Sequence, residues 1–246
     1  MLFLDYDGTL TPIVRTPDRA VLSREARKIL KELAKKKTIK LAIISGRSLK
    51  DIRKNVKIKN IIYAGNHGLE LVGPSIKYTN QTSLNFRIII EKIKKTLQDK
   101  LCSIKGIIIE DKGLTLSLHY RLVKKQDVST LKTIFYEAIA LPRVEEKIHV
   151  GTGKKVFEIK PPVSWDKGKI VLWLLARQCF AIEKNNILPV YIGDDTTDED
   201  AFKVLRNKGL TVFVGKPRKS FAEYYLKNSI EVVELLKEIN KTRNNN

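Results

Sequence analysis

The first ten residues pass from an apolar run directly into acidic turn chemistry. Residues 2–4 are all apolar, Asp5 and Asp7 follow two positions apart, and Gly8 comes next. A short apolar run bounded by turn residues is typical of a buried strand in an α/β sheet. Ligands of such sheets bind just beyond the carboxyl ends of the strands. We therefore expect Asp5 at a strand end and Asp7 in the next loop, with Gly8 allowing both carboxylates to face one point.

Two carboxylates this close repel each other unless a cation or a shared proton compensates the charge. The plainer interpretation is an acidic turn that caps a strand, and it is the better one for an isolated Asp-x-Asp. Three further polar clusters downstream favour a functional site instead.

The first 80 residues alternate between strand and helix patterns. Apolar runs at 40–44 and 61–64 follow helix patterns that begin near Ser23 and Ser48, and each run stops at a polar turn. The order strand, helix, strand, helix, strand predicts a parallel sheet.

The pattern changes near residue 81. Apolar residues at helical spacing over 88–97 and 128–139 are each followed by two strand-like runs. We place the turn of the second hairpin at the glycines of 151–153. Helix, hairpin, helix, hairpin is a self-contained α+β unit. We therefore predict an α/β protein in which 1–80 and 161–246 form the catalytic core and 81–160 form an inserted cap.

Four polar clusters fall at the ends of predicted elements. Three directly follow apolar strands and one lies at a helix start; they are Asp5 with Asp7, Ser45, Lys167, and Asp194 with Asp195 and Asp198. Carboxylate loops that converge on one sheet edge form an oxygen-ligand site of the kind that Mg²⁺ prefers. A lysine and a serine beside it supply donors for phosphate oxygens.

This set of groups suits phosphoryl transfer. A carboxylate is a competent nucleophile toward phosphorus once a metal offsets the charge repulsion. A second carboxylate can protonate the leaving oxygen and then deprotonate water.

The constellation resembles the haloacid-dehalogenase superfamily of aspartate-nucleophile phosphatases, whose core is a Rossmann-like parallel sheet. Residues 5–9 match its first motif, Ser45 the second, Lys167 the third and 193–198 the fourth. The resemblance implies that Asp5 is the nucleophile and Asp7 the general acid and base. It also implies that Ser45 and Lys167 hold the phosphoryl group. Magnesium would be bound by the carboxylates of Asp5 and Asp194 and by the carbonyl of Asp7.

Longer stretches are similar to the trehalose-phosphate phosphatases in particular. They are Leu4-Asp5-Tyr6-Asp7-Gly8-Thr9-Leu10-Thr11-Pro12-Ile13, Ile44-Ser45-Gly46-Arg47-Ser48-Leu49, Gly65-Asn66-His67-Gly68-Leu69-Glu70 and Gly193 to Glu199. The resemblance covers nearly the whole chain and implies hydrolysis of trehalose 6-phosphate to trehalose and phosphate. A related activity on sucrose phosphate or a glycosyl-3-phosphoglycerate is the alternative.

Five residues are candidates for substrate binding. Arg47 either binds the substrate or pairs with an acid near the site, and His67 either contacts the sugar or bonds backbone. Strand alternation places Arg121 on the face of His119. Lys155 and Glu158 resemble the cap residues that read sugar hydroxyls, although surface ion pairs are the plainer alternative.

Composition limits the other function classes. Lys and Arg number 47 against 27 Asp and Glu, which gives a formal charge of +20. The basic residues are spread along the chain without interleaved aromatics, so we expect a solvated surface and no nucleic-acid partner. A nucleic-acid-binding protein on an inactive phosphatase fold, or a phosphate-binding regulatory domain, would not need the acidic convergence.

Location and assembly are also expectations. The acid at position 5 interrupts the apolar start, and the longest apolar stretch, 170–176, is too short for a bilayer. Cys102 and Cys179 match no metal or redox spacing, which fits a reducing compartment. We expect a cytoplasmic protein without a membrane partner, and we favour a monomer.

Overall fold

A computed structural model describes residues 1–14, 16–81, 84–163, 165–182 and 187–241. The chain divides into a first unit of Met1–Thr79 with Trp165–Asn246 and a second unit of Asn80–Ser164. The borders expected at 81 and 160 lie a few residues from these.

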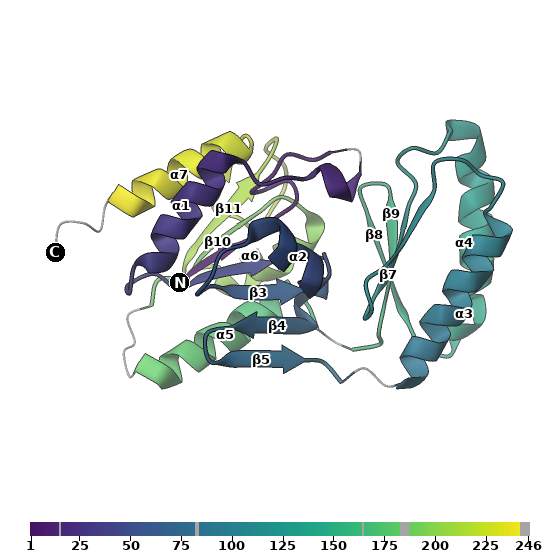
Figure 1. Ribbon diagram of the computed structural model, residues 1–246, viewed down its shortest axis with the longest axis horizontal. Helices are drawn as coiled ribbons and strands as arrows, with labels where there is room; N and C mark the ends of the chain where they lie inside the picture. Colours follow the sequence, from purple (N-terminus) through teal and green to yellow (C-terminus); the bar gives the residue numbers. More distant parts are fainter. Residues whose placement is uncertain (15, 82–83, 164, 183–186, 242–246) are drawn as a thin grey trace. The chain divides into compact units, whose positions relative to one another are not determined.

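The first unit is built on an eight-stranded sheet with the order β12-β11-β10-β1-β2-β3-β4-β5 (Figure 1). Strands β12, β11, β10, β1, β2 and β3 run parallel. The strands are β1 (Leu2–Leu4), β2 (Leu41–Ile44), β3 (Ile62–Gly65), β4 (Glu70–Gly73), β5 (Ile76–Thr79), β10 (Val190–Gly193), β11 (Leu210–Val214) and β12 (Tyr224–Leu226). Strand β1 lies between β10 and β2, so the carboxyl ends of these three strands are neighbours.

One edge of this sheet differs from the pattern that the sequence predicts. Strand β4 pairs antiparallel with β3, and β5 pairs antiparallel with β4. Each has only four residues, and Ser75 takes a positive φ of 56° in the turn between them. The sequence interpretation missed this hairpin because no clear apolar alternation accompanies it.

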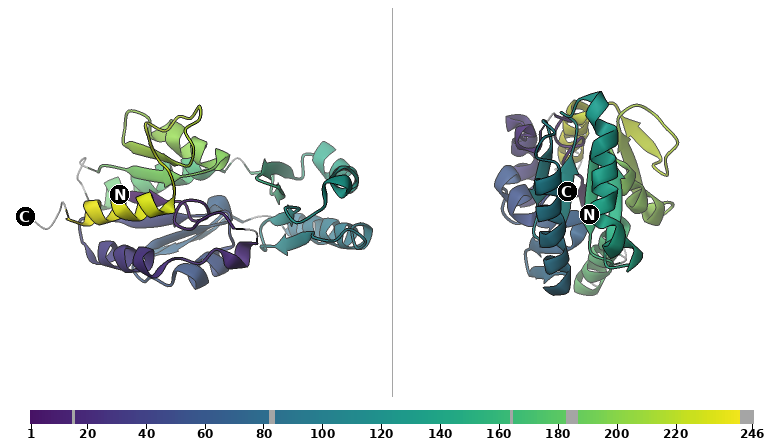
Figure 2. Two further views of the ribbon diagram at one scale, coloured as in Figure 1. Left: turned by 90° about the horizontal axis from the view of Figure 1, so that it is seen from above. Right: turned by 90° about the vertical axis from the view of Figure 1, so that its right-hand side faces the viewer.

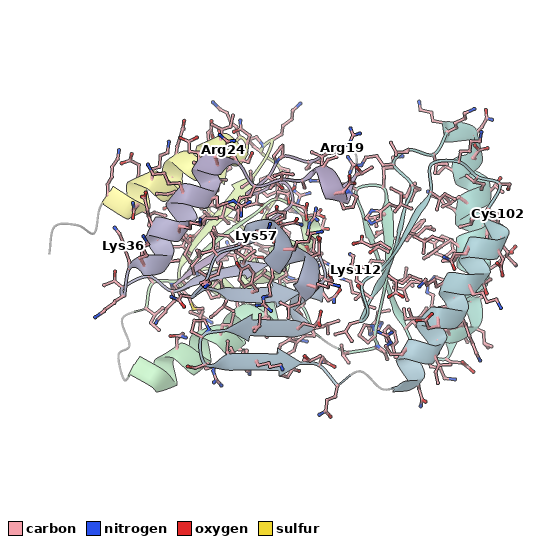
Figure 3. All side chains as sticks on the ribbon, in the orientation of Figure 1. Arg19, Arg24, Lys36, Lys57, Cys102 and Lys112 are labelled. Atoms are coloured by element: carbon pink, nitrogen blue, oxygen red, sulfur yellow. The ribbon has the colours of Figure 1, made fainter. Side chains whose placement is uncertain are left out.

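Helices cover both faces of the core sheet. Helices α1 (Arg24–Lys35), α2 (Leu49–Val56) and α7 (Ser229–Lys241) contribute to one apolar cluster, and α5 (Lys167–Ile182) and α6 (Glu199–Leu205) to the other. Helices α1 and α7 lie side by side, and Asn240 of α7 donates to Glu32 of α1 at 2.9 Å (Figure 1). Figure 3 shows Arg24 and Lys36 at the two ends of α1.

Helix α5 is only partly as predicted. Its apolar run suggests burial on all sides, and Ile170, Val171 and Leu174 are indeed buried. Leu172, however, is 41% exposed, because it points away from the sheet. The side chain of Cys179 in this helix lies outside the described residues.

The second unit is a four-stranded antiparallel sheet with two helices. The sheet order is β6-β7-β9-β8, and α3 and α4 lie side by side (Figure 2). The elements are α3 (Leu84–Lys100), β6 (Ile108–Asp111), β7 (Leu116–His119), α4 (Val128–Val144), β8 (His149–Gly153) and β9 (Val156–Lys160). Phe135 of α4 stacks on Phe157 of β9 with ring centroids 4.3 Å apart. This helix–sheet core fits the predicted α+β pattern.

Two details of this unit were predicted wrongly. Strand β8 continues through the three residues 151–153, and the turn falls on Lys154 and Lys155, where Lys155 has a φ of 68°. Strand β7 ends at His119, so Arg121 lies in a turn and does not share a strand face with His119. Gly151 and Gly153 pair with residues of β9, so they belong to the strand and not to the turn.

Short 3₁₀ helices connect several elements: η1 (Pro17–Arg19), η2 (Asn66–Gly68), η3 (Lys125–Asp127) and η4 (Thr196–Asp198). Among the helices of the described ranges, none has the length and apolar character needed to cross a bilayer.

Packing of α1 on the sheet can be tested at Leu30, which is fully buried. We expect Leu30→Ala to lower the free energy of unfolding by about 2–5 kcal/mol, since it removes apolar contacts and leaves a cavity. The exposed neighbour Lys31 is the control, and Lys31→Ala should change stability by less than about 0.5 kcal/mol. Urea unfolding followed by tryptophan fluorescence measures both, because Trp165 and Trp173 belong to the first unit. Equal losses of stability in Leu30→Ala and Lys31→Ala would contradict the packing of α1 on the sheet through Leu30.

Candidate active site

The ammonium group of Lys167 binds one carboxylate that follows β1 and one that follows β10. Its Nζ lies 2.7 Å from Oδ1 of Asp5 and 2.8 Å from Oδ1 of Asp198. Lys167 is the first residue of α5, where Asp166 caps the helix by accepting from the backbone N–H of Lys169 at 2.8 Å. All three charged side chains are buried. The helix start thus directs a cation at the carboxyl end of β1.

Asp198 makes a full set of hydrogen bonds. Its Oδ1 accepts from Lys167 and from the hydroxyl of Tyr191 at 2.7 Å, and its Oδ2 accepts from the backbone N–H groups of Asp194 and Asp195. A carboxylate offers about four lone-pair sites. These contacts occupy that number of sites, so Asp198 fixes the loop after β10 and orients Lys167. Asp195 caps η4 by accepting from Thr196.

Three buried carboxylates form a group that could hold a metal ion. One oxygen from each of Asp5, Asp194 and Asp198 lies within 4.8 Å of the others. Three carboxylates and the one ammonium of Lys167 leave a formal charge of −2. Burial raises the pKa of Asp5 well above its usual value, and the charges of Asp198 and Asp194 add to this effect, while Lys167 opposes it. The donor set and the unmet charge both fit a hard divalent cation.

Within this group, Asp5 and Asp194 are the better metal ligands because the sites of Asp198 are already used. The carboxylate of Asp194 lies against the first loop: a Cβ added at Gly8 would stand 2.1 Å from its Oδ2. Gly8 also has a φ of 90°, which an L side chain rarely adopts. A glycine at this position therefore allows the loops after β1 and β10 to meet.

Lys167 keeps its charge in this setting. Burial alone would lower the pKa of its ammonium group, but the charges of Asp198 and Asp5 outweigh burial, so that the pKa lies well above its usual value.

The carboxylate of Asp7 has a different partner from that of Asp5. Its two carboxylate oxygens accept from Nε and Nη2 of Arg47, both at 2.7 Å. The two first-loop carboxylates thus have different partners, since Lys167 binds Asp5 and Arg47 binds Asp7. Arg47 also donates to Asp51 at 2.6 Å and to the carbonyl of Pro17 at 2.6 Å.

Ser45 lies at the end of β2 and is buried. Its Oγ accepts from the backbone N–H of Arg47 at 3.1 Å. The loop around η2 is held to this turn, since the backbone N–H of His67 donates to the carbonyl of Ser45 at 2.9 Å. The His67 ring lies against Gly46, where an added Cβ would stand 2.6 Å from its Nε2. The structure thus brings His67 to the second motif.

The predicted residues of the second unit fall into two places. Glu158 is buried on β9, and its two oxygens pair with Lys112 at 3.2 Å and Lys160 at 3.0 Å. Lys155 and Arg121 lie at the end of the hairpin, where Arg121 donates to the carbonyl of Lys154 at 2.9 Å. The ion pairs of Glu158 are those that the plainer interpretation expects. Figure 3 labels Lys112.

Sequence reasoning missed several partners of these residues. Lys112 was not singled out, although it follows the first predicted strand of the cap. Tyr191 was not singled out either, because in the sequence it belongs to the apolar pattern of a strand. Asp51 carried a usable signal, because it lies four residues after Arg47 at the start of a helix, where such pairs are close.

The contacts of Asp198 lead to a stability prediction. Asp198→Asn replaces an acceptor of four hydrogen bonds by an amide and takes one of the two counter-charges from Lys167, so we expect a loss on the order of 3 kcal/mol. Tyr191→Phe removes only one donor to Asp198 and should cost roughly 1–2 kcal/mol. Tryptophan-monitored urea unfolding of both variants measures the difference. An unchanged free energy of unfolding in Asp198→Asn would contradict the claim that Asp198 fixes the loop after β10.

The chain is similar to known trehalose-phosphate phosphatases. A family model described as trehalose-phosphatase matches residues 3–230. Probable trehalose-phosphate phosphatase D of Arabidopsis thaliana is 39% identical over 97% of this chain and 66% of its own length. Trehalose 6-phosphate phosphatase RA3 of Zea mays is 37% identical, over 97% and 69% of the two chains. The chain thus spans about two thirds of the length of these relatives.

Solved structures show the same fold. The C-terminal domain of Candida albicans trehalose-6-phosphate phosphatase has a TM-score of 0.83 at 27% identity, covering 98% of this chain and 92% of that one. A haloacid dehalogenase-like hydrolase from Bacteroides thetaiotaomicron has a TM-score of 0.68 at 17% identity, covering 97% and 98%. The second likeness concerns the fold alone. The predicted α/β fold with its parallel core sheet is confirmed, and the chain belongs to the trehalose-phosphatase family, a family of phosphoric monoester hydrolases with the haloacid-dehalogenase fold.

Proposed function

We propose that this chain hydrolyses trehalose 6-phosphate to trehalose and phosphate, with Mg²⁺ as cofactor and a phosphoryl-enzyme intermediate on Asp5. The observation that carries the proposal is the buried group of Asp5, Asp194 and Lys167 at the ends of β1 and β10 and the start of α5. Family membership supports the reaction class. The relatives named above support the sugar phosphate.

In the first step, Asp5 attacks phosphorus and the bond to the sugar oxygen breaks. Lys167 binds Oδ1 of Asp5, which leaves Oδ2 as the attacking atom. Asp7 gives a proton to the leaving sugar oxygen. In the second step Asp7 takes a proton from water, the water oxygen bonds to phosphorus, and the acyl phosphate bond to Asp5 breaks.

Two further residues are proposed to hold the transferring group. An ammonium has three donors, and Lys167 uses two of them on Asp5 and Asp198, so one remains for a phosphoryl oxygen. Ser45 has a hydroxyl donor at the end of the neighbouring strand β2. His67 stays a candidate contact from the loop on this turn.

For the metal, we propose the carboxylates of Asp5 and Asp194 and the backbone carbonyl of Asp7 as ligands. Magnesium, when bound, offsets the negative charge of the nucleophile and of the phosphoryl oxygens. The formal charge of −2 on the buried group is what supports a divalent ion.

The sugar is proposed to be read by the second unit, which acts as a cap. Glu158 accepts and Arg121 and Lys155 donate, and a site built on such hydrogen bonds penalises substrates without the matching hydroxyls. Of the three, Glu158 is the buried one, and its pairs with Lys112 and Lys160 fix the position of its carboxylate.

A panel of sugar phosphates tests the reaction. We expect phosphate release from trehalose 6-phosphate to exceed that from sucrose phosphate and a glycosyl-3-phosphoglycerate, and to stop when EDTA removes the metal. Asp5→Asn should lose several orders of magnitude in kcat, since removal of a nucleophile can cost about 10⁶-fold. Its circular dichroism spectrum serves as the control for folding. Undiminished turnover in EDTA after exhaustive dialysis, or by Asp5→Asn, would contradict the proposed mechanism.

A second prediction concerns specificity. Glu158→Ala should lose about 10-fold or more in kcat/KM toward trehalose 6-phosphate, because one buried hydrogen-bonding group is worth 1–3 kcal/mol. The variant should still hydrolyse p-nitrophenyl phosphate at the original rate, since this ester has no sugar hydroxyls. Glu91→Ala is a matched control, because Glu91 lies in the same unit but is exposed on α3. Equal losses on both esters would assign Glu158 to folding, and no loss would place sugar recognition elsewhere.

A further inference from the structure

The guanidinium group of Arg47 is occupied by acceptors of the protein itself. Nε and Nη2 form a fork on the two oxygens of Asp7, Nη1 binds Asp51, and Nη2 also binds the carbonyl of Pro17. All three nitrogens are therefore engaged, at 2.6–2.7 Å. The Arg47 side chain is only 7% exposed.

The position of this group is fixed from a second side. Its central carbon lies 5.2 Å from the ring centre of Tyr6, which is within the range of a cation–π contact. The Tyr6 ring is itself anchored, because its hydroxyl donates to the carbonyl of Ala20 at 2.9 Å. An arginine that binds a phosphoryl group needs donors directed at that group, and four of the five N–H donors of Arg47 are directed at Asp7, Asp51 and Pro17.

The backbone of the first loop leaves little freedom except in the Asp7 side chain. The N–H of Gly8 donates to the carbonyl of Thr11 at 2.8 Å, and the N–H groups of Leu10 and Thr11 donate to the carbonyl of Tyr6 at 3.0 Å. The Asp7 side chain is 45% exposed. Its contact with Arg47 is thus what sets the plane of its carboxylate.

We propose that Arg47 is a positioning residue that acts through Asp7 and is not a ligand of the substrate. This inference rests on the proposed function, in which Asp7 moves the protons. The fork fixes the direction of the Asp7 carboxylate. Each Asp7 oxygen keeps one further lone-pair site, so Asp7 can accept or release a proton while the fork holds its plane.

A positioning role has a kinetic signature that a binding role lacks. p-Nitrophenolate is a good leaving group and needs little help from an acid, so transfer of the phosphoryl group to Asp5 should survive a misplaced Asp7. Hydrolysis of the phosphoryl-enzyme needs Asp7 as base and should become slow. The first turnover then releases p-nitrophenol faster than the following ones.

The test is a stopped-flow measurement on Arg47→Met, which removes the charge and the fork but keeps an unbranched apolar side chain against Tyr6. We expect a burst of about one p-nitrophenol per enzyme, followed by turnover about 10²-fold or more below wild type. Asp7→Asn should give the same burst. With trehalose 6-phosphate, whose leaving group is an alkoxide, Arg47→Met should show a slow first turnover without a burst.

Two further variants sharpen the test. Arg47→Lys keeps the charge but cannot form the fork, so we expect the same burst from it, and it serves if Arg47→Met does not fold. Asp51→Asn is the matched control: it removes the other acid that pairs with Arg47, leaves the contact with Asp7, and should give no burst.

The alternatives give different results. If Arg47 binds the substrate, its variants raise KM and the inhibition constant of inorganic phosphate and show no burst, which overturns the inference. If its role is only structural, activity on both esters falls in step with the folded fraction, which overturns it as well. A burst with Asp7→Asn but not with either Arg47 variant overturns the inference alone. A wild-type chain that hydrolyses neither ester overturns the proposed function and this inference with it.

Discussion

The contact of Lys167 with Asp5 and Asp198 is the interaction on which the candidate site depends. In the chain, Lys167 lies 162 positions from Asp5 and 31 positions from Asp198. An ammonium removed from water loses several kcal/mol of solvation, and only close counter-charges compensate that loss. Asp198 in turn binds Tyr191 and two backbone N–H groups of the loop after β10. The start of α5, the end of β1 and the β10 loop are thus held by one connected set of hydrogen bonds.

The parallel sheet explains why such a set can form. Strands β10, β1 and β2 are parallel neighbours, so their carboxyl ends and the loops that follow lie at one edge of the sheet. The same arrangement creates an electrostatic problem, since it gathers carboxylates in a buried place. One lysine reduces the charge without removing it. A site with this residual charge is suited to a divalent cation and to a substrate whose transferring group is itself an anion.

The core of this arrangement could be predicted from the sequence, because strand ends are visible as apolar runs that stop at polar residues. This reasoning located Asp5, Ser45 and Asp194 at strand ends, and Lys167 at a helix start. The antiparallel strands β4 and β5 could not be predicted in the same way, because their pairing depends on contacts across the sheet. The cap hairpin misled the prediction, since glycines that favour turns elsewhere are paired strand residues here and the turn falls on two lysines.

Side-chain partners were the least predictable part of the site. The roles assigned to Asp7, Arg47 and the cap residues remain predictions from resemblance and chemistry. Arg47 and Asp7 are 40 residues apart, and nothing in the local sequence of either one indicates a fork between them. Glu158 is held by Lys112, which comes from the other hairpin of the same unit. Such pairs follow from how the loops cross in space, which a linear pattern does not contain.

The most direct test of the account is a calorimetric titration of the chelator-treated protein with Mg²⁺. The group of Asp5, Asp194 and Asp198 keeps a formal charge of −2 after the charge of Lys167 is counted. If this group is the metal site, wild type binds one Mg²⁺ per chain. Asp194→Asn, which takes one charge from the group, binds it at least about 10-fold more weakly. Binding that is absent in wild type, or unchanged in Asp194→Asn, would contradict the claim that this buried group is a divalent-cation site.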